Sequence, residues 1–387
     1  IEDYEKMTDI VEVWFDSGST HAYVLEKRED LKWPASMYLE GSDQHRGWFH
    51  SSLLESCGTR GKAPFESILS HGFVVDGKGL KMSKSLGNII SPEDILKKYG
   101  ADILRIWVAT SDYAEDLRVD YSILEQHAES YRKIRNTFRY ILGNLNDNFE
   151  KVNFEKVDIN NFPELEQYML HKIYNLNLVF ERNFEKYNFH ALYKEIINFC
   201  TSDLSAFYFD IRKDVLYCDS PESKKRTLTI RFLNIILEIL LKWFAPVLSF
   251  TTEEIYSLLK IKEKESIHLE KFPEIPPNWN NPNLNNKWLE LIKIRDKCNS
   301  SIELKRASKE IGSSLEADLK ILLNDKLIKL SEGTDFSELC ITSGAKINKI
   351  KKDDEEEIVI ETNKAEGTKC NVCWKISKDK CERHGDL

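Results

Sequence analysis

The string Lys81-Met82-Ser83-Lys84-Ser85 constrains this chain most, because it places two lysines and two serines within five residues. Glycines surround it, with Gly77 and Gly79 before the string and Gly87 after it. Glycine keeps a loop mobile, and lysines on a mobile loop can follow the charge of a polyphosphate as a bond breaks. A solvated basic turn is the alternative that a lone Lys-x-x-Lys would favour. The complete string with its flanks favours a polyphosphate-binding loop.

Two segments nearer the start predict strands that end in polar turns. Residues 9–15 alternate in polarity and predict a strand, which the turn at 16–19 ends. Residues 37–40 predict a short buried strand that runs into Gly41 and then into a helical run to Glu55. Ligands of open α/β sheets bind where strands end in such turns. Trp14 is therefore a candidate ligand contact, with a buried core aromatic as the alternative.

These segments together resemble the class I aminoacyl-tRNA synthetases. The string Glu40-Gly41-Ser42-Asp43-Gln44-His45-Arg46-Gly47-Trp48-Phe49 is similar to that of the isoleucine-specific branch of this family. The resemblance implies a Rossmann-like catalytic domain, ATP with magnesium as a substrate, and isoleucine and the tRNA for isoleucine as partners. In such an enzyme the amino-acid carboxylate attacks the α-phosphorus of ATP and pyrophosphate leaves. Positioning and charge neutralisation supply most of the catalysis of this transfer.

The resemblance also implies roles for individual residues. Lys84 would be the catalytic lysine at the leaving pyrophosphate, with Lys81 beside it. Two indoles offer a dry wall to a branched aliphatic side chain, and carboxylates accept hydrogen bonds from ammonium or ribose hydroxyl groups. His45 and Arg46 fit a catalytic role and a helix-start role equally. The residues implied to bind ATP, the adenylate or isoleucine are Glu40, Gly41, Asp43, Gln44, Trp14, Trp48, His71, Gly72, Ser83 and Lys84.

Residues 121–272 show long helical periodicity, and the apolar segment 228–244 predicts a buried helix. Arg132, Arg135 and Arg139 share one helix face, and Lys224-Lys225-Arg226 forms a second basic cluster. Each fits either a solvated face or an RNA contact. The resemblance implies a helical bundle that binds the anticodon stem of tRNA. The net charge of −9 argues against nonspecific coating of nucleic acid, but an acidic enzyme can still hold RNA on a local basic face.

The last third of the chain predicts a connection, a small module and a metal site. Residues 272–286, rich in Pro and Asn, predict an extended linker, and 288–304 predict a helix. Alternating segments over 319–360 predict a small α/β module, in which the charged run 351–357 would be a solvated turn.

The chain ends in Cys370-x-x-Cys373 and Cys381-x-x-His384, two pairs that suit one tetrahedral zinc ion. Because four protein ligands leave no position open for a substrate, we expect a structural zinc. The family usually ends in four cysteines, so His384 leaves the identity of the fourth ligand open.

The expected fold is α/β plus all-α, in four parts. These are a partial Rossmann-like catalytic domain (1–120), a helical anticodon-binding domain (121–275), a C-terminal junction module (276–365) and a zinc-binding knuckle (366–387). The chain begins at Ile1 and lacks a His-x-Gly-His motif and an inserted editing domain, which indicates the C-terminal portion of a longer enzyme. A catalytically inactive tRNA-binding module is the alternative. We further expect no membrane association, a cytoplasmic location and a monomer.

Overall fold

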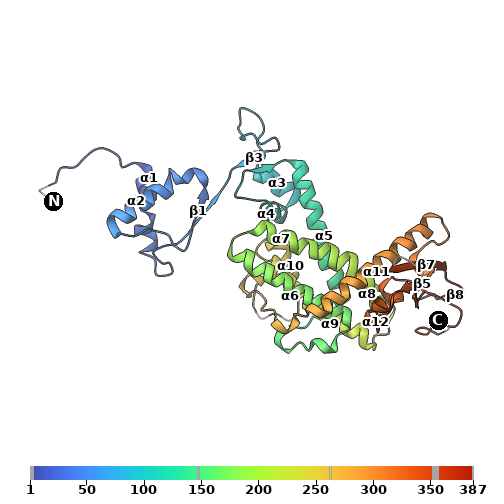
Figure 1. The fold of residues 1–387 in the computed structure, drawn as a ribbon. Helices are drawn as coiled ribbons and strands as arrows, with labels where there is room; N and C mark the ends of the chain where they lie inside the picture. The colour runs from blue at the N-terminus through green and yellow to red at the C-terminus, as the bar shows by residue number, and fades with distance from the viewer. Residues whose placement is uncertain (1–3, 146–148, 261, 263, 351–356, 386–387) are drawn as a thin grey trace. The chain divides into compact units, whose positions relative to one another are not determined.

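The computed structural model describes residues 4–145, 149–260, 262, 264–350 and 357–385, shown as a ribbon in Figure 1. The chain divides into two compact units, residues 1–128 and 129–387, and each is described by itself. The predicted charged turn falls mainly on 351–356, outside the described residues. None of the described helices is long and apolar enough to cross a membrane.

The strand predicted over residues 9–15 is wrong, because a helix, α1 (Val13–Gly18), begins within it. The Glu12 carboxylate accepts a hydrogen bond from the backbone N–H of Trp14 at 2.7 Å and so caps the helix. No strand lies beside these residues in the described part of the chain to pair with them. Helix α1 instead contacts α2 (Trp48–Arg60), where a Cβ at Gly18 would lie 2.4 Å from Oε1 of Glu55. A short π-helix, η1 (His21–Leu25), follows.

A β-α-β unit follows, whose first strand and helix agree with the sequence prediction. Strand β1 (Tyr38–Gly41) leads through the 3₁₀ turn η2 (Ser42–His45) into α2, and β2 (Ile68–His71) returns parallel to β1. The expectation that β1 is buried holds only in part, because Tyr38 is buried whereas Leu39 and Glu40 are exposed. The register pairs Gly41 with His71, so both strands end at the same edge.

A second parallel pair joins β3 (Val74–Asp76) to β4 (Leu117–Val119). Between them lie α3 (Pro92–Tyr99) and α4 (Ala101–Ala109). Helix α3 begins behind a capping serine, Ser91, whose side chain accepts from the N–H of Asp94, and it stops at Gly100. Met82 packs against a buried cluster that includes Ile95 and Trp107, so the lysine loop is attached to this core.

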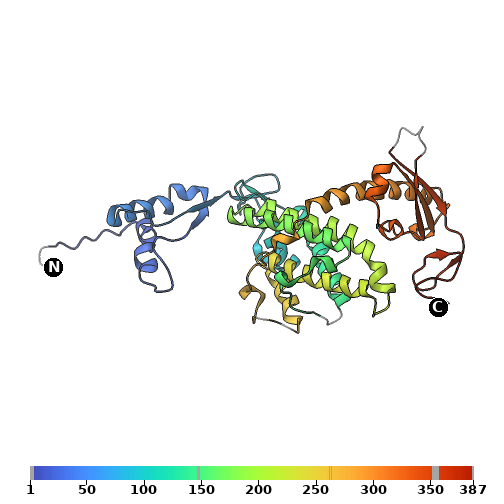
Figure 2. The ribbon, with the colours of Figure 1, turned by 60° about the horizontal axis from the view of Figure 1, so that its bottom comes forward.

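The second unit is a helical bundle, and the predicted helical character of 121–272 is confirmed (Figure 2). Its central helix, α9 (Lys224–Phe244), is buried over most of its length. Phe138 and Phe180 from neighbouring helices pack on Phe244 and Trp243 of α9. The other bundle helices are α5 (Tyr121–Leu145), α6 (Glu164–Glu185), α7 (Phe189–Asn198), the π-helix η5 (Phe199–Phe209), α8 (Asp210–Cys218) and α10 (Ser249–Leu258).

The predicted extended linker is shorter than expected. A 3₁₀ turn, η7 (Pro277–Trp279), buries Trp279, and α11 (Pro282–Ala307) begins six residues before the predicted helix start at residue 288. Asn281 caps α11 by accepting from the N–H of Leu284, and Pro282 fits the first helical turn. The sequence reasoning read these two residues as linker composition, whereas they are a helix start.

The predicted small α/β module is confirmed. A three-stranded sheet of order β6-β5-β7 is formed by β5 (Ala317–Leu323), β6 (Gly344–Lys349) and β7 (Ile358–Lys364). Two short helices, α12 (Asp325–Leu330) and α13 (Phe336–Leu339), connect β5 to β6. The chain then forms a small hairpin of β8 (Thr368–Lys369) and β9 (Ile376–Ser377).

Candidate functional site

The ends of β1 and β2 bring several of the predicted ligand-binding residues together. A Cβ added to Gly41 would lie 2.8 Å from Oδ1 of Asp43, 3.7 Å from Cε1 of His71 and 3.8 Å from a ring carbon of Phe73. The backbone of Gly41 is therefore flanked by a carboxylate, an imidazole and a phenyl ring. Gly41 itself is buried, so these three groups pack around its backbone at the end of β1.

Trp14, Gln44 and Trp48 gather around Gly47. The side-chain oxygen of Gln44 accepts from the backbone N–H of Trp48 at 2.9 Å, and a Cβ on Gly47 would lie 3.4 Å from the Trp14 ring. The indole N–H of Trp48 donates to the carbonyl of Ser17 at 2.9 Å, which links α2 to α1. The Trp14 side chain is 42% exposed, so it is not a core aromatic. The sequence analysis groups Trp14, Gln44 and Trp48 through the family resemblance, but it does not predict the hydrogen bond between Trp48 and Ser17.

The structure explains why position 72 is a glycine, which the sequence alone does not. A Cβ at this position would lie 2.4 Å from the backbone carbonyl of Glu115 and 2.7 Å from the nitrogen of Asp116. The N–H of Gly72 donates to the carbonyl of Tyr113 at 2.9 Å. Its lack of a side chain thus lets two segments of this chain approach, whatever it does toward a ligand. His71 is half-buried, with Nδ1 2.8 Å from the carbonyl of Gly72.

Asp76 and Asn88 hold the base of the lysine loop. The Asp76 carboxylate accepts from the backbone N–H groups of Lys78 and Leu80 at 2.9 and 2.8 Å, and from the side-chain amide of Asn88 at 2.8 Å. The hydrogen bond from Asn88, followed by that from the Leu80 N–H, lowers the pKa of Asp76. The oxygen of the Asn88 amide accepts from the N–H of Ser83 at 2.9 Å, and this brace closes the loop.

The side chains of Lys81 and Lys84 are exposed and make no hydrogen bond or ion pair within the part of the chain that the structure describes. The hydroxyl of Ser83 lies 3.1 Å from that of Ser85. The loop therefore combines a fixed base with two uncommitted cations. The sequence analysis assigns no role to Asp76 or Asn88, although the Asp-Gly-x-Gly turn and the Asn after Gly87 are signals of a turn at these positions.

The predicted basic residues differ in their availability. Arg132, Arg135 and Arg139 are exposed on α5, and Arg132 pairs with Glu129 at 2.5 Å. In the second cluster, Lys224 is exposed, whereas Lys225 pairs with Glu338 and Arg226 donates to the carbonyl of Leu216.

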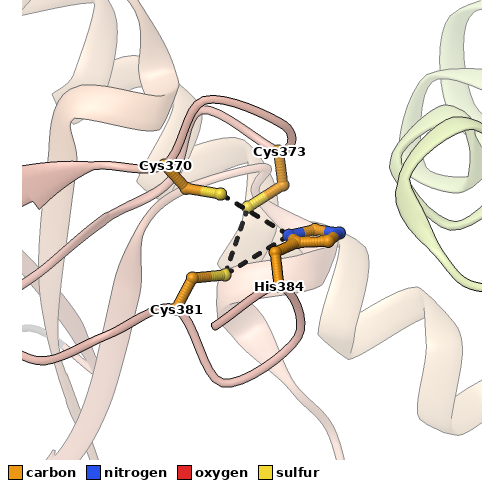
Figure 3. Close-up of side chains that lie close together, drawn as sticks. All are labelled: Cys370, Cys373, Cys381 and His384. Carbon is orange, nitrogen blue, oxygen red and sulfur yellow. Dashed lines mark hydrogen bonds between the residues drawn. The ribbon is translucent and has the colours of Figure 1, made fainter. Parts of the chain in front are cut away.

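Cys370, Cys373, Cys381 and His384 converge at the end of the chain, as their spacing predicts (Figure 3). Their ligand atoms all lie within 4.8 Å of one another. Nδ1 of His384 is 3.5 Å from Sγ of Cys370 and 3.4 Å from Sγ of Cys381, and the sulfurs of Cys373 and Cys381 are 3.7 Å apart. A tetrahedral zinc ion with usual bond lengths requires ligand separations of about 3.5–3.8 Å. The four residues therefore suit a metal such as zinc in donor type, and these three separations are close to those of a tetrahedral site, although the whole set spans up to 4.8 Å.

The backbone favours the thiolate of one cluster residue, Cys370, and the thiolate is the form that binds metal. Backbone N–H groups, that of Cys373 first, lower the pKa of Cys370 to about 6. Burial instead raises the pKa of Cys373 to about 11.

Comparisons with known proteins agree with the description of the N-terminal part of the chain and with that of the helical bundle. Residues 1–120 match the family model for class I tRNA synthetases (I, L, M and V), and 166–321 match that for the anticodon-binding domain of tRNA ligases. The chain is also similar in fold to a LeuRS from Agrobacterium radiobacter K84 in a ternary complex with tRNA and LeuAMS. That similarity has a TM-score of 0.57 at 15% identity and covers 83% of this chain and 36% of the other.

The chain belongs to the class I aminoacyl-tRNA synthetases. Its similarity to an isoleucine–tRNA ligase of Pelagibacter ubique is 71% identity over 100% of this chain and 42% of that protein. A Mesorhizobium japonicum protein of the same name is 45% identical over 97% of this chain and 38% of its own length. The chain thus spans less than half the length of these relatives.

Proposed function

We propose that this chain is the part of an isoleucine–tRNA ligase that carries the lysine loop, the anticodon-binding bundle and a zinc knuckle. The longer enzyme attaches isoleucine to its tRNA through an isoleucyl-adenylate. One observation carries the proposal furthest: the Asp76–Asn88 brace fixes the loop base while Lys81 and Lys84 stay uncommitted. Cations that are free in the ground state can be used on a leaving group in the transition state.

In the proposed mechanism, the strand ends bind the adenylate. Asp43, beside the backbone of Gly41, accepts hydrogen bonds from the ribose, and Glu40 contacts the aminoacyl part of the adenylate. Trp14, Gln44 and Trp48 line the side of the pocket that takes the isoleucine side chain. His71 and Gly72 lie beside the adenine.

The lysine loop acts on the triphosphate. Ser83 and Lys84 contact the ATP phosphates, and Lys84, with Lys81 beside it, neutralises charge on the departing pyrophosphate. Magnesium, bound with ATP, would share this charge. The carboxylate of isoleucine then forms the bond to the α-phosphorus that pyrophosphate gives up.

The proposed domain division follows these roles: 1–120 for adenylate chemistry, 121–275 for the anticodon stem, 276–365 as a junction and 366–387 as the zinc knuckle. The exposed arginines of α5 are the proposed tRNA contacts on the bundle. A cytoplasmic, monomeric enzyme is part of the same proposal.

Zinc held by Cys370, Cys373, Cys381 and His384 would be structural, because these four groups complete a tetrahedron. Metal analysis of the purified chain under reducing conditions tests this: we expect about one zinc per chain, and a value near zero would reject the assignment.

The function is tested on the complete protein that contains this chain. We expect pyrophosphate exchange that depends on isoleucine, and charging of the tRNA for isoleucine. The second candidate, a catalytically inactive tRNA-binding module, predicts tRNA binding without exchange. A matched transcript with an altered anticodon separates specific from general RNA binding in both cases.

A further inference from the structure

The knuckle, residues 368–385, contacts the rest of the second unit at Ser343 and at the end of α8. The backbone N–H of Ile376 donates to the hydroxyl of Ser343 at 2.7 Å. Elsewhere it meets the C-terminal end of α8, at Cys218 and Asp219. A cleft of about 870 Å³ lies between the knuckle and helices α8, α9 and α13. Because this cleft interrupts the packing, the contacts at α8 have to hold that side of the knuckle.

His384 belongs to both the metal cluster and the α8 contact. Its Nδ1 faces the sulfurs of Cys370 and Cys381, while its Nε2 lies 2.8 Å from the backbone carbonyl of Cys218. Carbonyls in the last turn of a helix lack intrahelical partners. A ring whose Nδ1 lone pair is given to a metal carries its proton on Nε2, and it can then donate to this carbonyl.

Arg383 is the second contact at the same helix end. Its guanidinium donates to Oδ2 of Asp214 at 2.5 Å and to Oδ1 of Asp219 at 2.6 Å. Asp214 lies within α8 and Asp219 directly follows it. The thiol of Cys218 also lies 3.8 Å from the carbonyl of Val372. A cation at a helix C-terminus is further favoured by the helix dipole.

We propose that the metal site is a latch, in which metal bound by His384 and the three cysteines fixes the knuckle on the end of α8 through His384 and Arg383. The proposal rests on the structural zinc proposed above and deepens it. Metal fixes the His384 tautomer that donates to Cys218, and it orders the turn that presents Arg383 to the two aspartates. By linkage, docking on α8 strengthens metal binding by the same factor as metal strengthens docking.

Arg383→Gln gives the sharpest test, because the latch and simple electrostatics predict opposite signs. Removing a positive charge beside the site would, by charge alone, strengthen the binding of a divalent cation. The latch predicts weaker binding, by about tenfold, because docking is lost. Lys378→Gln is the matched control: it removes the same charge from the knuckle, but Lys378 pairs with Glu366 where both side chains are more than 70% exposed. We expect less than a twofold change for the control.

Cobalt(II) provides the probe, in titrations of the full chain against a competing chelator. Its visible absorption reports a tetrahedral sulfur and nitrogen ligand set, so a variant that merely misfolds at the site is recognised.

Hydrogen exchange of the backbone amides over 211–219 measures the opposite effect, that of metal binding on the docking of the knuckle on α8. We expect metal removal to speed exchange at this helix end in the wild-type chain and to change it little in Arg383→Gln. The latch is overturned if Arg383→Gln binds cobalt as tightly as Lys378→Gln, if the chain takes up no cobalt, or if chelation leaves exchange over 211–219 unchanged. These measurements do not involve aminoacylation, so they stand apart from the test of the proposed function.

Discussion

The guanidinium of Arg212 holds the carboxylate of Glu166 in a two-point ion pair, with Nε and Nη2 each 2.6 Å from a different oxygen. Both side chains are buried, with 3% and 0% of their surfaces exposed. The hydroxyl of Tyr208 donates to the same carboxylate at 2.8 Å. The remaining nitrogen of Arg212 reaches Glu338 of α13 at 2.6 Å, so one side chain ties two bundle helices to the C-terminal module.

Arg212→Met should destabilise the second unit by about 3–5 kcal/mol, because it leaves the Glu166 carboxylate buried without its partner. Lys305→Met is the comparison, since Lys305 pairs with Glu310 on the surface and such pairs contribute about 0–1 kcal/mol. Urea unfolding followed by helical circular dichroism measures both. Equal shifts in the two variants would contradict a stabilising role for the buried pair.

Lys84→Ala in the complete enzyme should slow adenylate formation at least about a hundredfold, with a small change in isoleucine affinity, because the lysine acts mainly in the transition state. Isoleucine-dependent pyrophosphate exchange measures the rate. Lys78→Ala serves as the control, since Lys78 is an exposed lysine before the string. Exchange near the wild-type rate in Lys84→Ala would refute the assignment.

Trp48→Ala should raise the Michaelis constant for isoleucine far more than that for ATP, because the indole would contact only the amino-acid side chain. The ring also stacks on Tyr38, with centroids 4.1 Å apart and planes 8° apart. Trp48→Phe is therefore the informative partner variant, since it retains an aromatic ring and loses only the bond to Ser17. Equal increases for both substrates in Trp48→Ala would make Trp48 a packing residue.

His171 should make stability depend on pH. Burial, and then the nearby Lys172, lower the pKa of this histidine below its usual 6.5, and its Nδ1 accepts the backbone N–H of Asn281 at 2.9 Å. Below pH 6.5 the unfolded chain gains a proton that the native ring does not take up until a lower pH. The contribution of neutral His171 to the free energy of unfolding is therefore intact above pH 6.5, and it decreases as the pH falls from 6.5 toward the lower pKa of the native ring.

His171→Gln should flatten this part of the pH profile. Thermal unfolding of wild type and variant between pH 7 and pH 5 gives the comparison, in which carboxylate effects common to both proteins cancel. Parallel profiles would show that the His171 ring does not resist protonation.

Local patterns predicted the elements that depend on few distant contacts. The apolar segment 228–244 predicted the buried course of α9. The error at residues 9–15 has a physical cause, because alternation predicts a strand only where a neighbouring strand accepts its hydrogen bonds. In the described structure a cap at Glu12 starts a helix instead.

The candidate sites also differ in how far local sequence predicts them. Cys370 to His384 could be grouped from spacing alone, because the four ligands lie within one short segment. The contact between Arg383 and Asp214 joins residues far apart in the sequence, and nothing local to either one indicates it. The hydrogen bond between Asp76 and Asn88 could be predicted only in part. The turn residues indicate a loop, but they do not indicate that these two side chains close it.

In the proposed mechanism, the closed base of the lysine loop would also set how Lys84 encounters the triphosphate of ATP. Residues 77–87 are tethered at both ends by the bond between Asp76 and Asn88, so the ammonium group of Lys84 can travel no more than about 20 Å from that root. A charge confined to such a volume has an effective concentration in the millimolar range or above. A bound triphosphate would therefore meet this lysine by short tethered diffusion, and the length of the loop, rather than the lysine itself, would set the frequency of those encounters.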